Sequence, residues 1–161
     1  MIEIIIAVVL LILDQITKHL AFLYCQQPIV LIPGVLELSY AQNTGAAWGI
    51  LDGLGVVLVA LVLVVCALLA WFYIKKHKVM RPISRVTLAL IFAGALGNGL
   101  DRIALGYVRD MIYFRLINFP VFNLADICIT IGAGLFILET FFFKNNLFDI
   151  WEDMWKNRKK K

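Results

Sequence analysis

Four long apolar runs constrain the fold of this chain more than any other feature. They cover roughly residues 2–24, 54–74, 83–100 and 121–143, and the second run contains no charged residue. About 20 apolar residues in an α-helix cross the hydrocarbon core of a bilayer. Hydrophobic residues make up 62% of the 161 residues, which is more than a soluble domain of this length carries. We therefore predict an all-α membrane protein with four transmembrane helices.

The basic residues predict how these helices are oriented. Lysine and arginine gather between the second and third runs, at residues 75–85, and in the tail, at residues 144–161. Such clusters mark the cytoplasmic side, and beside membrane helices they contact anionic lipid rather than nucleic acid. We therefore expect both termini in the cytoplasm, residues 26–53 and 101–120 outside it, and no nucleic-acid partner. We predict a single membrane domain over residues 1–161.

Two segments outside the apolar runs also predict structure. Residues 29–32 and 35–40 are rich in β-prone residues and are separated by Pro33 and Gly34, which favours a hairpin or a small sheet. Such a sheet on the outer membrane surface would form one wall of a substrate groove. In the tail, apolar residues recur with helical spacing at Leu147, Phe148, Trp151, Met154 and Trp155. They predict an amphipathic helix on the inner membrane surface, the alternative being a disordered basic tail.

The residue types that are present exclude several kinds of hydrolase. Neither serine lies in a G-x-S-x-G sequence, and the two histidines do not form H-E-x-x-H. The three cysteines include no C-x-x-C pair, which argues against a zinc site or a disulfide framework. Acid–base chemistry in this chain therefore depends on carboxylates, and we expect neither a metal nor an organic cofactor.

Two aspartates lie at the ends of apolar runs. Asp110 follows the third run within Y-V-R-D-M, and Asp126 begins the fourth run within F-N-L-A-D. Carboxylates at the ends of membrane helices are costly and usually face a protein interior or a wet cavity. Two of them that share one proton have the chemistry of an aspartic peptidase. The alternatives are a solvated loop acid for Asp110 and a helix N-terminal cap for Asp126.

Short polar sequences in chain order extend this interpretation. They are Asp14-Gln15-Ile16-Thr17-Lys18, Asn43-Thr44-Gly45-Ala46-Ala47-Trp48 and Gly97-Asn98-Gly99-Leu100-Asp101-Arg102, together with the two aspartate sequences. From residue 12 to residue 134 or so, the arrangement resembles the bacterial lipoprotein signal peptidase family (signal peptidase II). Members of that family are four-helix membrane aspartic peptidases with a small extracytoplasmic β-cradle.

The resemblance implies a function and a catalytic pair. Asp110 and Asp126 would be catalytic, one ionised to activate a water and the other protonated to polarise the scissile carbonyl. The chain would cleave diacylglyceryl-modified prolipoproteins just before the lipidated cysteine, at the outer face of the bacterial cytoplasmic membrane. Its expected partners are these prolipoproteins and membrane lipid, and we expect a monomer.

Three residues of the third polar sequence and one asparagine near Asp126 are candidate supporting residues. Asn98, Asp101 and Arg102 share one helix face by their spacing. Arg102 is expected to bind substrate carbonyls or to stabilise the tetrahedral intermediate, the alternative being an arginine bound to lipid phosphate. Asn123 is expected to orient the carboxylate of Asp126, and Asn98 that of either aspartate.

The first two polar sequences supply further candidates. The resemblance places Asn43 in a substrate-contacting loop, the alternative being a simple turn asparagine. Asp14 and Lys18 stand four residues apart on a predicted helix, so we expect them to pair and to be structural.

Two residues depart from the family pattern or lie outside it. The family more often has a small apolar residue where this chain has Arg109. An inward-turned Arg109 would lower the pKa of Asp110, but we expect its side chain to point to water or lipid headgroups. Glu139, deep in the fourth run, has no family role, and we expect it to form a salt bridge with a basic loop residue.

Two other function classes compete with this interpretation. Other intramembrane aspartic peptidases carry G-x-G-D, whereas the sequence G-N-G-L-D at residues 97–101 is one residue too long. A proton-linked transporter would use the carboxylates as ion sites, but transporters usually contain internal repeats, and none is evident in this sequence.

Overall fold

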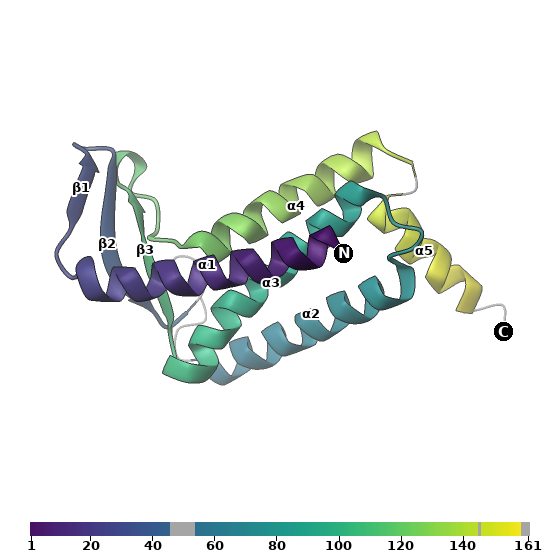
Figure 1. Cartoon of the computed structure of the whole chain (residues 1–161), viewed down its shortest axis with the longest axis horizontal. Coiled ribbons are helices and arrows are strands. Elements are labelled where there is room, and N and C mark those ends of the chain that lie inside the picture. Colours follow the sequence, from purple (N-terminus) through teal and green to yellow (C-terminus); the bar gives the residue numbers. More distant parts are fainter. Residues whose placement is uncertain (46–53, 145, 159–161) are drawn as a thin grey trace.

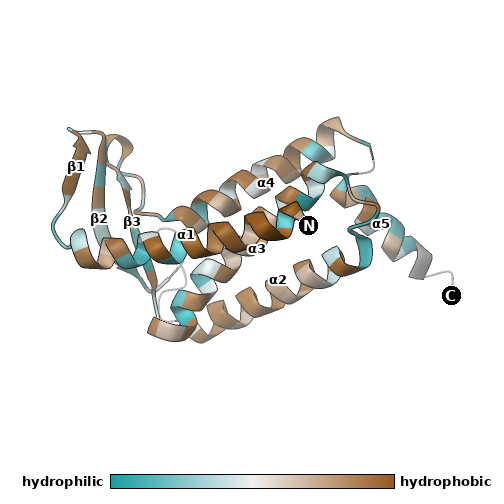
Figure 2. Ribbon diagram, in the orientation of Figure 1, coloured by the Kyte–Doolittle hydropathy of each residue, from teal (hydrophilic) through white to brown (hydrophobic). Residues whose placement is uncertain are grey.

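The computed structural model describes residues 1–45, 54–144 and 146–158. Within these ranges, four helices are long and apolar enough to cross a membrane, namely α1 (Ile2–Tyr24), α2 (Gly55–Lys76), α3 (Pro82–Leu105) and α4 (Leu124–Phe142). Figure 1 shows them as a bundle with a small sheet at one end and helix α5 at the other. In Figure 2, hydrophobic residues cover the helices and polar residues concentrate towards their ends. The predicted fold class is confirmed.

Helix α3 is the central element of the bundle, because it packs against α1, α2 and α4. Its contact with α4 is especially close. A Cβ atom on Gly94 would collide with the backbone carbonyl of Ala125, and one on Gly132 would lie 2.6 Å from the side chain of Ile91. Small residues allow membrane helices to approach in this way. The close approach brings the polar residues of α3 within reach of the first turn of α4.

Helix α3 also extends further than predicted. We placed the end of this apolar run at Leu100, but the helix continues to Leu105 and ends at Gly106, whose φ is 83°. Glycine adopts this left-handed conformation without the steric penalty of other residues. Asp101 and Arg102 therefore lie on the last turns of a helix, where their positions are set by α3 itself.

A three-stranded antiparallel sheet lies at this end of the bundle. Its strands are β1 (Ile29–Ile32), β2 (Leu36–Asn43) and β3 (Val108–Phe114), in that spatial order. The β1–β2 hairpin matches the prediction, whereas β3 was not predicted, because its partner strand is distant in the sequence. The pairing of β2 with β3 sets Ala41 opposite Asp110. Ile112 also forms a bridge with Phe122, so the chain entering α4 runs beside β3.

The tail forms the predicted helix, α5 (Leu147–Arg158). Its packing differs from that of a helix lying only on a membrane surface. Leu147 and Ile150 are buried in a cluster at the ends of α2 and α3, with Phe72, Met80 and Leu88. Phe148, Trp151 and Trp155 of the predicted stripe remain exposed. One side of α5 is therefore part of the protein core, and the other presents large aromatic side chains.

Candidate active site

Asp126 is positioned by the start of helix α4. Asn123 caps this helix: its Oδ1 accepts the backbone N–H of Asp126 at 3.0 Å, and the Oδ2 of Asp126 accepts the backbone N–H of Asn123 at 3.1 Å. This reciprocal pair is a capping box. The cap that we considered as an alternative role for Asp126 is therefore present. The arrangement holds its half-buried carboxylate in a defined orientation.

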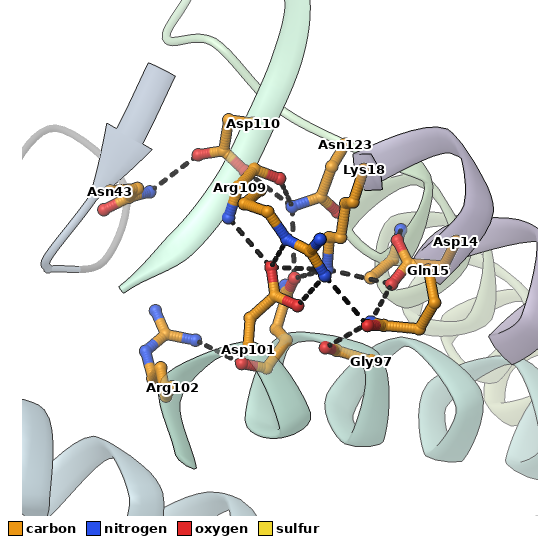
Figure 3. A network of polar contacts seen from close by, with 12 residues as sticks. Asp14, Gln15, Lys18, Asn43, Gly97, Asp101, Arg102, Arg109, Asp110 and Asn123 are labelled. Carbon is orange, nitrogen blue, oxygen red and sulfur yellow. Dashed lines mark hydrogen bonds and ion pairs between the residues drawn. The ribbon is translucent and has the colours of Figure 1, made fainter. Parts of the chain in front are cut away.

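Asp110 is positioned by strand β3 and is only 2% exposed. The Nδ2 of Asn123 donates to its Oδ1 at 2.6 Å, and the Nδ2 of Asn43 donates to its Oδ2 at 3.0 Å. Both oxygens of this carboxylate are therefore held by amide donors from outside its own strand. Figure 3 shows Asn43 and Asn123 approaching Asp110 from different sides.

Two asparagines connect the carboxylates. Asn98, on α3, donates from its Nδ2 to the Oδ1 of Asp126 at 2.8 Å, and its Oδ1 accepts from the Nδ2 of Asn123 at 3.1 Å. We expected Asn123 to orient the carboxylate of Asp126, and its backbone N–H donates to that carboxylate, as does the side chain of Asn98. The amide nitrogen of Asn123 donates to Asp110 as well, a contact that we did not predict. Asn123 thus contacts both aspartates.

A buried ion pair lies beneath this network. Lys18 is fully buried, and its Nζ lies 2.8 Å from the Oδ2 of Asp14 and 2.9 Å from the Oδ1 of Asn98. The Oδ1 of Asp14 accepts the backbone N–H of Ala125 at 2.9 Å. The predicted pairing of Asp14 with Lys18 is therefore present. It connects α1 both to α3 and to the first turn of α4.

Arg109 does not lie where we expected. Its side chain is 14% exposed and turns inward, and its Nη2 lies 2.7 Å from the Oδ1 of Asp101. The Oδ2 of Asp101 also accepts from the Nε and from the backbone N–H of Arg109, at 3.1 and 2.9 Å. Gln15 accepts from the same guanidinium at 2.9 Å (Figure 3). The expectation of water or lipid headgroups was wrong, because Asp101 provides a buried bidentate partner.

This Arg109–Asp101 pair attaches β3 to α3 one residue before Asp110. From the sequence we predicted that Asp101 shares a helix face with other polar residues, and we predicted no role for Gln15. The departure from the family pattern at position 109 was the available signal, because an arginine that replaces a small apolar residue requires a partner. Its partner Asp101 could not be identified from spacing alone.

Arg102 and Asn43 surround the start of a loop. The Nη2 of Arg102 donates to the carbonyl of Gly45 at 2.7 Å, and the Oδ1 of Asn43 accepts the backbone N–H of Gly45 at 3.1 Å. Asn43 therefore forms the turn that we gave as its alternative role and also contacts Asp110. The Nε of Arg102 is buried without a hydrogen-bond partner among the described residues. The rest of the predicted substrate loop, residues 46–48, lies outside the described residues.

The surroundings of Asp110 favour a bound proton. Burial is the largest cause, and with the charge of Asp126 it raises the pKa of Asp110 from 3.8 to about 6, although the donors Asn43 and Asn123 oppose the shift. Burial disfavours the charged form of a carboxyl, and so does a nearby like charge. The less exposed of the two aspartates is thus the more suitable proton carrier.

Glu139 corrects another expectation. It is 1% exposed and accepts hydrogen bonds from the hydroxyls of Ser84 at 2.7 Å and Thr87 at 3.1 Å. Among the described residues, its partners are these hydroxyls of α3 and not a basic loop residue. Within the same ranges, no group of three histidine, cysteine, aspartate or glutamate side chains could hold a metal ion.

Comparison with known proteins identifies the family. The profile of the family described as Signal peptidase (SPase) II matches residues 6–142. This chain belongs to the signal peptidase II family. A lipoprotein signal peptidase of Symbiobacterium thermophilum is 41% identical over 144 residues, which are 86% of this chain and 93% of that protein. One from Microcystis aeruginosa is 42% identical over 147 residues, 89% of this chain and 94% of that protein.

Solved structures agree with this family assignment. Two structures described as a bacterial membrane enzyme have TM-scores of 0.79 and 0.77 and sequence identities of 35% and 34% with this chain. The first covers 86% of both chains, and the second covers 88% of this chain and 94% of its own. Together with the four apolar helices, these relatives identify this signal peptidase II family member as a multi-pass bacterial membrane protein.

Proposed function

We propose that this protein removes signal peptides from diacylglyceryl-modified prolipoproteins, cleaving just before the lipidated cysteine. Asp110 and Asp126 are the catalytic pair. The observation that carries the proposal is that Asn123 contacts both carboxylates while Asn98 and Asn43 orient one each. Three asparagines, one on α3, one on β2 and one just before α4, thus converge on one pair of acids. The relatives are named lipoprotein signal peptidases, which supports prolipoproteins as the substrate class.

The different environments of the two acids suggest their roles. Asp110 is buried and has a raised pKa, so it holds the proton and donates a hydrogen bond to the scissile carbonyl oxygen. Asp126 is half-buried and more exposed than Asp110, so it is the base that accepts a proton from the water attacking the carbonyl carbon. The tetrahedral intermediate collapses when its C–N bond breaks and the departing nitrogen takes a proton from the pair.

Arg102 has a supporting role in this proposal. Its cationic side chain is on the last turns of α3, and its charge acts on both aspartates. It stabilises negative charge on the intermediate, as preorganised donors do in other hydrolases. Asp14, Lys18 and Asp101 are structural and keep α1, α3 and β3 in place around the pair.

The substrate fits the location of the pair. A prolipoprotein with a signal helix and a diacylglyceryl group remains in the membrane, so the peptidase must bind it there. The pair of Asp110 and Asp126 lies where the bundle of membrane helices adjoins the sheet, which suits such a substrate. In our proposed orientation this end of the bundle lies outside the cytoplasm, and both termini lie inside.

Cleavage of a lipidated peptide in detergent micelles tests the proposal. The parent should cut a diacylglyceryl lipobox peptide before the lipidated cysteine, without an effect of EDTA. Asp110→Asn and Asp126→Asn should each lose activity by at least about 1,000-fold while remaining folded. Asp153→Asn is the matched control, because Asp153 is exposed on α5. A folded parent that leaves the lipidated peptide intact, or either dyad variant at near-full rate, would favour an ion-pathway function instead.

A further inference from the structure

A second feature lies at the end of the bundle away from the sheet, where the start of α1, the end of α2 and the start of α3 meet (Figure 1). It is a cavity of about 300 Å³ lined by all three helices, mostly with apolar side chains such as Val8, Leu69 and Phe92. Apolar cavities of about 150 Å³ stay dry and bind small hydrocarbons. In a bilayer, the hydrocarbon available to such a cavity is the acyl chain of a lipid.

Arg85 lines this cavity and has unused hydrogen-bonding capacity. Its side chain is 29% exposed, and its nearest carboxylate oxygen, on Glu3, is 3.6 Å from its Nη1. Among the residues that the structure describes, none forms a hydrogen bond with its guanidinium, and its Nε is buried without a partner. Glu3 accepts instead from the hydroxyl of Tyr73 at 2.8 Å. An arginine in this state is suited to phosphate oxygens, which match its fork of donors.

The charge around the cavity favours the same kind of ligand. The segment from the end of α2 to the start of α3 carries Lys75, Lys76, Lys78 and Arg81 in addition to Arg85. Basic residues near a membrane helix end attract anionic lipid headgroups. An apolar cavity, an arginine with unused donors and a basic border together match a molecule with a hydrocarbon tail and a phosphate.

We propose that this cavity binds one acyl chain of an anionic phospholipid whose headgroup phosphate pairs with Arg85. The site is at the opposite end of the bundle from Asp110 and does not depend on the proposed peptidase function. The bound lipid comes from the leaflet that adjoins the basic segment. Its acyl chain fills the part of the cavity between α1 and α2.

The headgroup contact is tested on the full chain in detergent. The protein is titrated with dioleoyl phosphatidylglycerol, and bound lipid is counted by native mass spectrometry. Arg85→Gln should weaken the tightest bound lipid about tenfold, the size of one lost charge-assisted hydrogen bond. Lys144→Gln removes the same charge from an exposed position after α4, outside the basic segment and the lining of the cavity, and should bind like the parent. Equal losses in both variants would indicate general charge attraction and overturn the proposal.

The acyl-chain contact is tested by filling the cavity while leaving Arg85 intact. Ala70→Phe places a large ring at a residue that lines the cavity and should displace the lipid. Ala60→Phe, at an exposed position of the same helix, should not. Inorganic phosphate at millimolar concentration should fail to compete with the lipid, because the acyl chain contributes most of the affinity. Retention of the lipid by Ala70→Phe, or its displacement by phosphate alone, would contradict the proposed site.

Discussion

At the residue scale, Asn123 is the side chain on which the geometry of both carboxylates depends. Asn123→Ala removes the donor to Asp110 and the cap of α4 together. We expect kcat for lipopeptide cleavage to fall about 100-fold, because small displacements of catalytic groups cost that much. The free energy of unfolding should fall by about 1–3 kcal/mol, because a buried acceptor loses its partner.

Asn146 provides the control for this variant. It caps α5 with the same reciprocal pattern, because its Oδ1 accepts the N–H of Asp149 at 3.0 Å and Asp149 accepts its N–H at 3.3 Å. Asn146→Ala should cost about 1 kcal/mol of stability and leave kcat unchanged. Equal losses of activity in the two variants would mean that Asn123 acts through general stability alone.

Arg109 is the second residue whose role follows from its contacts. Arg109→Ala breaks a buried bidentate pair, and we expect a loss of about 3 kcal/mol in stability. Because β3 then loses its attachment next to Asp110, kcat should fall about tenfold with KM nearly unchanged. Arg109→Lys should recover only part of this loss, because an ammonium cannot bind Asp101 bidentately.

An exposed ion pair on α5 serves as the control for position 109. Lys156 pairs with Glu152 and both side chains are exposed, so Lys156→Ala should leave the free energy of unfolding nearly unchanged. Parent-like kcat in Arg109→Ala, measured on folded protein, would mean that the pair does not position Asp110.

The protonation of Asp110 should depend on its partner. Isotope-edited infrared spectra of the parent should place its titration near pH 6, and Asp126→Asn should lower this pKa by removing a negative charge. Because the folded-state pKa lies above the ordinary value of 3.8, the linked stability is full below pH 3.8 and is lost as pH rises through about 6. An unshifted pKa in Asp126→Asn would mean that the two acids do not interact.

At the scale of elements, the α3–α4 contact determines whether the site can form. Gly94 allows the backbone of α4 to pass against α3. A Cβ atom added to Gly134, on α4, would have no atom within 4 Å apart from the adjacent backbone of its own helix. Gly94→Ala should lower the free energy of unfolding by about 2 kcal/mol and reduce activity, because the helices must separate. Gly134→Ala should be neutral or stabilising by up to about 1 kcal/mol. Denaturation of both variants in the same detergent distinguishes the two outcomes.

The arrangement of the elements also explains why Asp110 and Asp126 both lie within hydrogen-bond distance of Asn123. The first turn of α4 places Asp126, and the bridge between Ile112 and Phe122 directs the chain from β3 into that turn. The helix and the strand thus share a short connection. A change in the register of β3 by one residue would turn Asp110 to the other face of the sheet.

At the scale of the whole molecule, our proposed orientation places the sheet outside the cytoplasm and the basic segment inside. Val30→Cys, in β1, should react with a membrane-impermeant maleimide on intact cells, and Lys78→Cys should react only after the membrane is opened. Both positions are exposed, whereas the native Cys25, Cys66 and Cys128 are buried and give little background. Labelling in the opposite pattern would reverse the assignment of both termini.

Much of the fold could be predicted from local sequence properties. Membrane helices form from apolar runs of sufficient length because a backbone in lipid must satisfy its own hydrogen bonds, so length and composition alone predicted α1 and α2 closely. The β1–β2 hairpin followed from Pro33 and Gly34 between β-prone segments. Both signals are contained within a few neighbouring residues, and for that reason they can be read without a structure.

The sequence by itself determined which residue types this protein has for chemistry: aspartates supported by asparagines, in an order that resembles one family. Only the tertiary structure decided which of them touch. Asn123 donates from its side chain to Asp110 and from its backbone to Asp126, and Arg109 turns inward to Asp101. Those contacts depend on where β3 pairs with β2 and how closely α3 approaches α4. Both depend on packing between segments far apart in the chain, so neither can be derived from spacing along it.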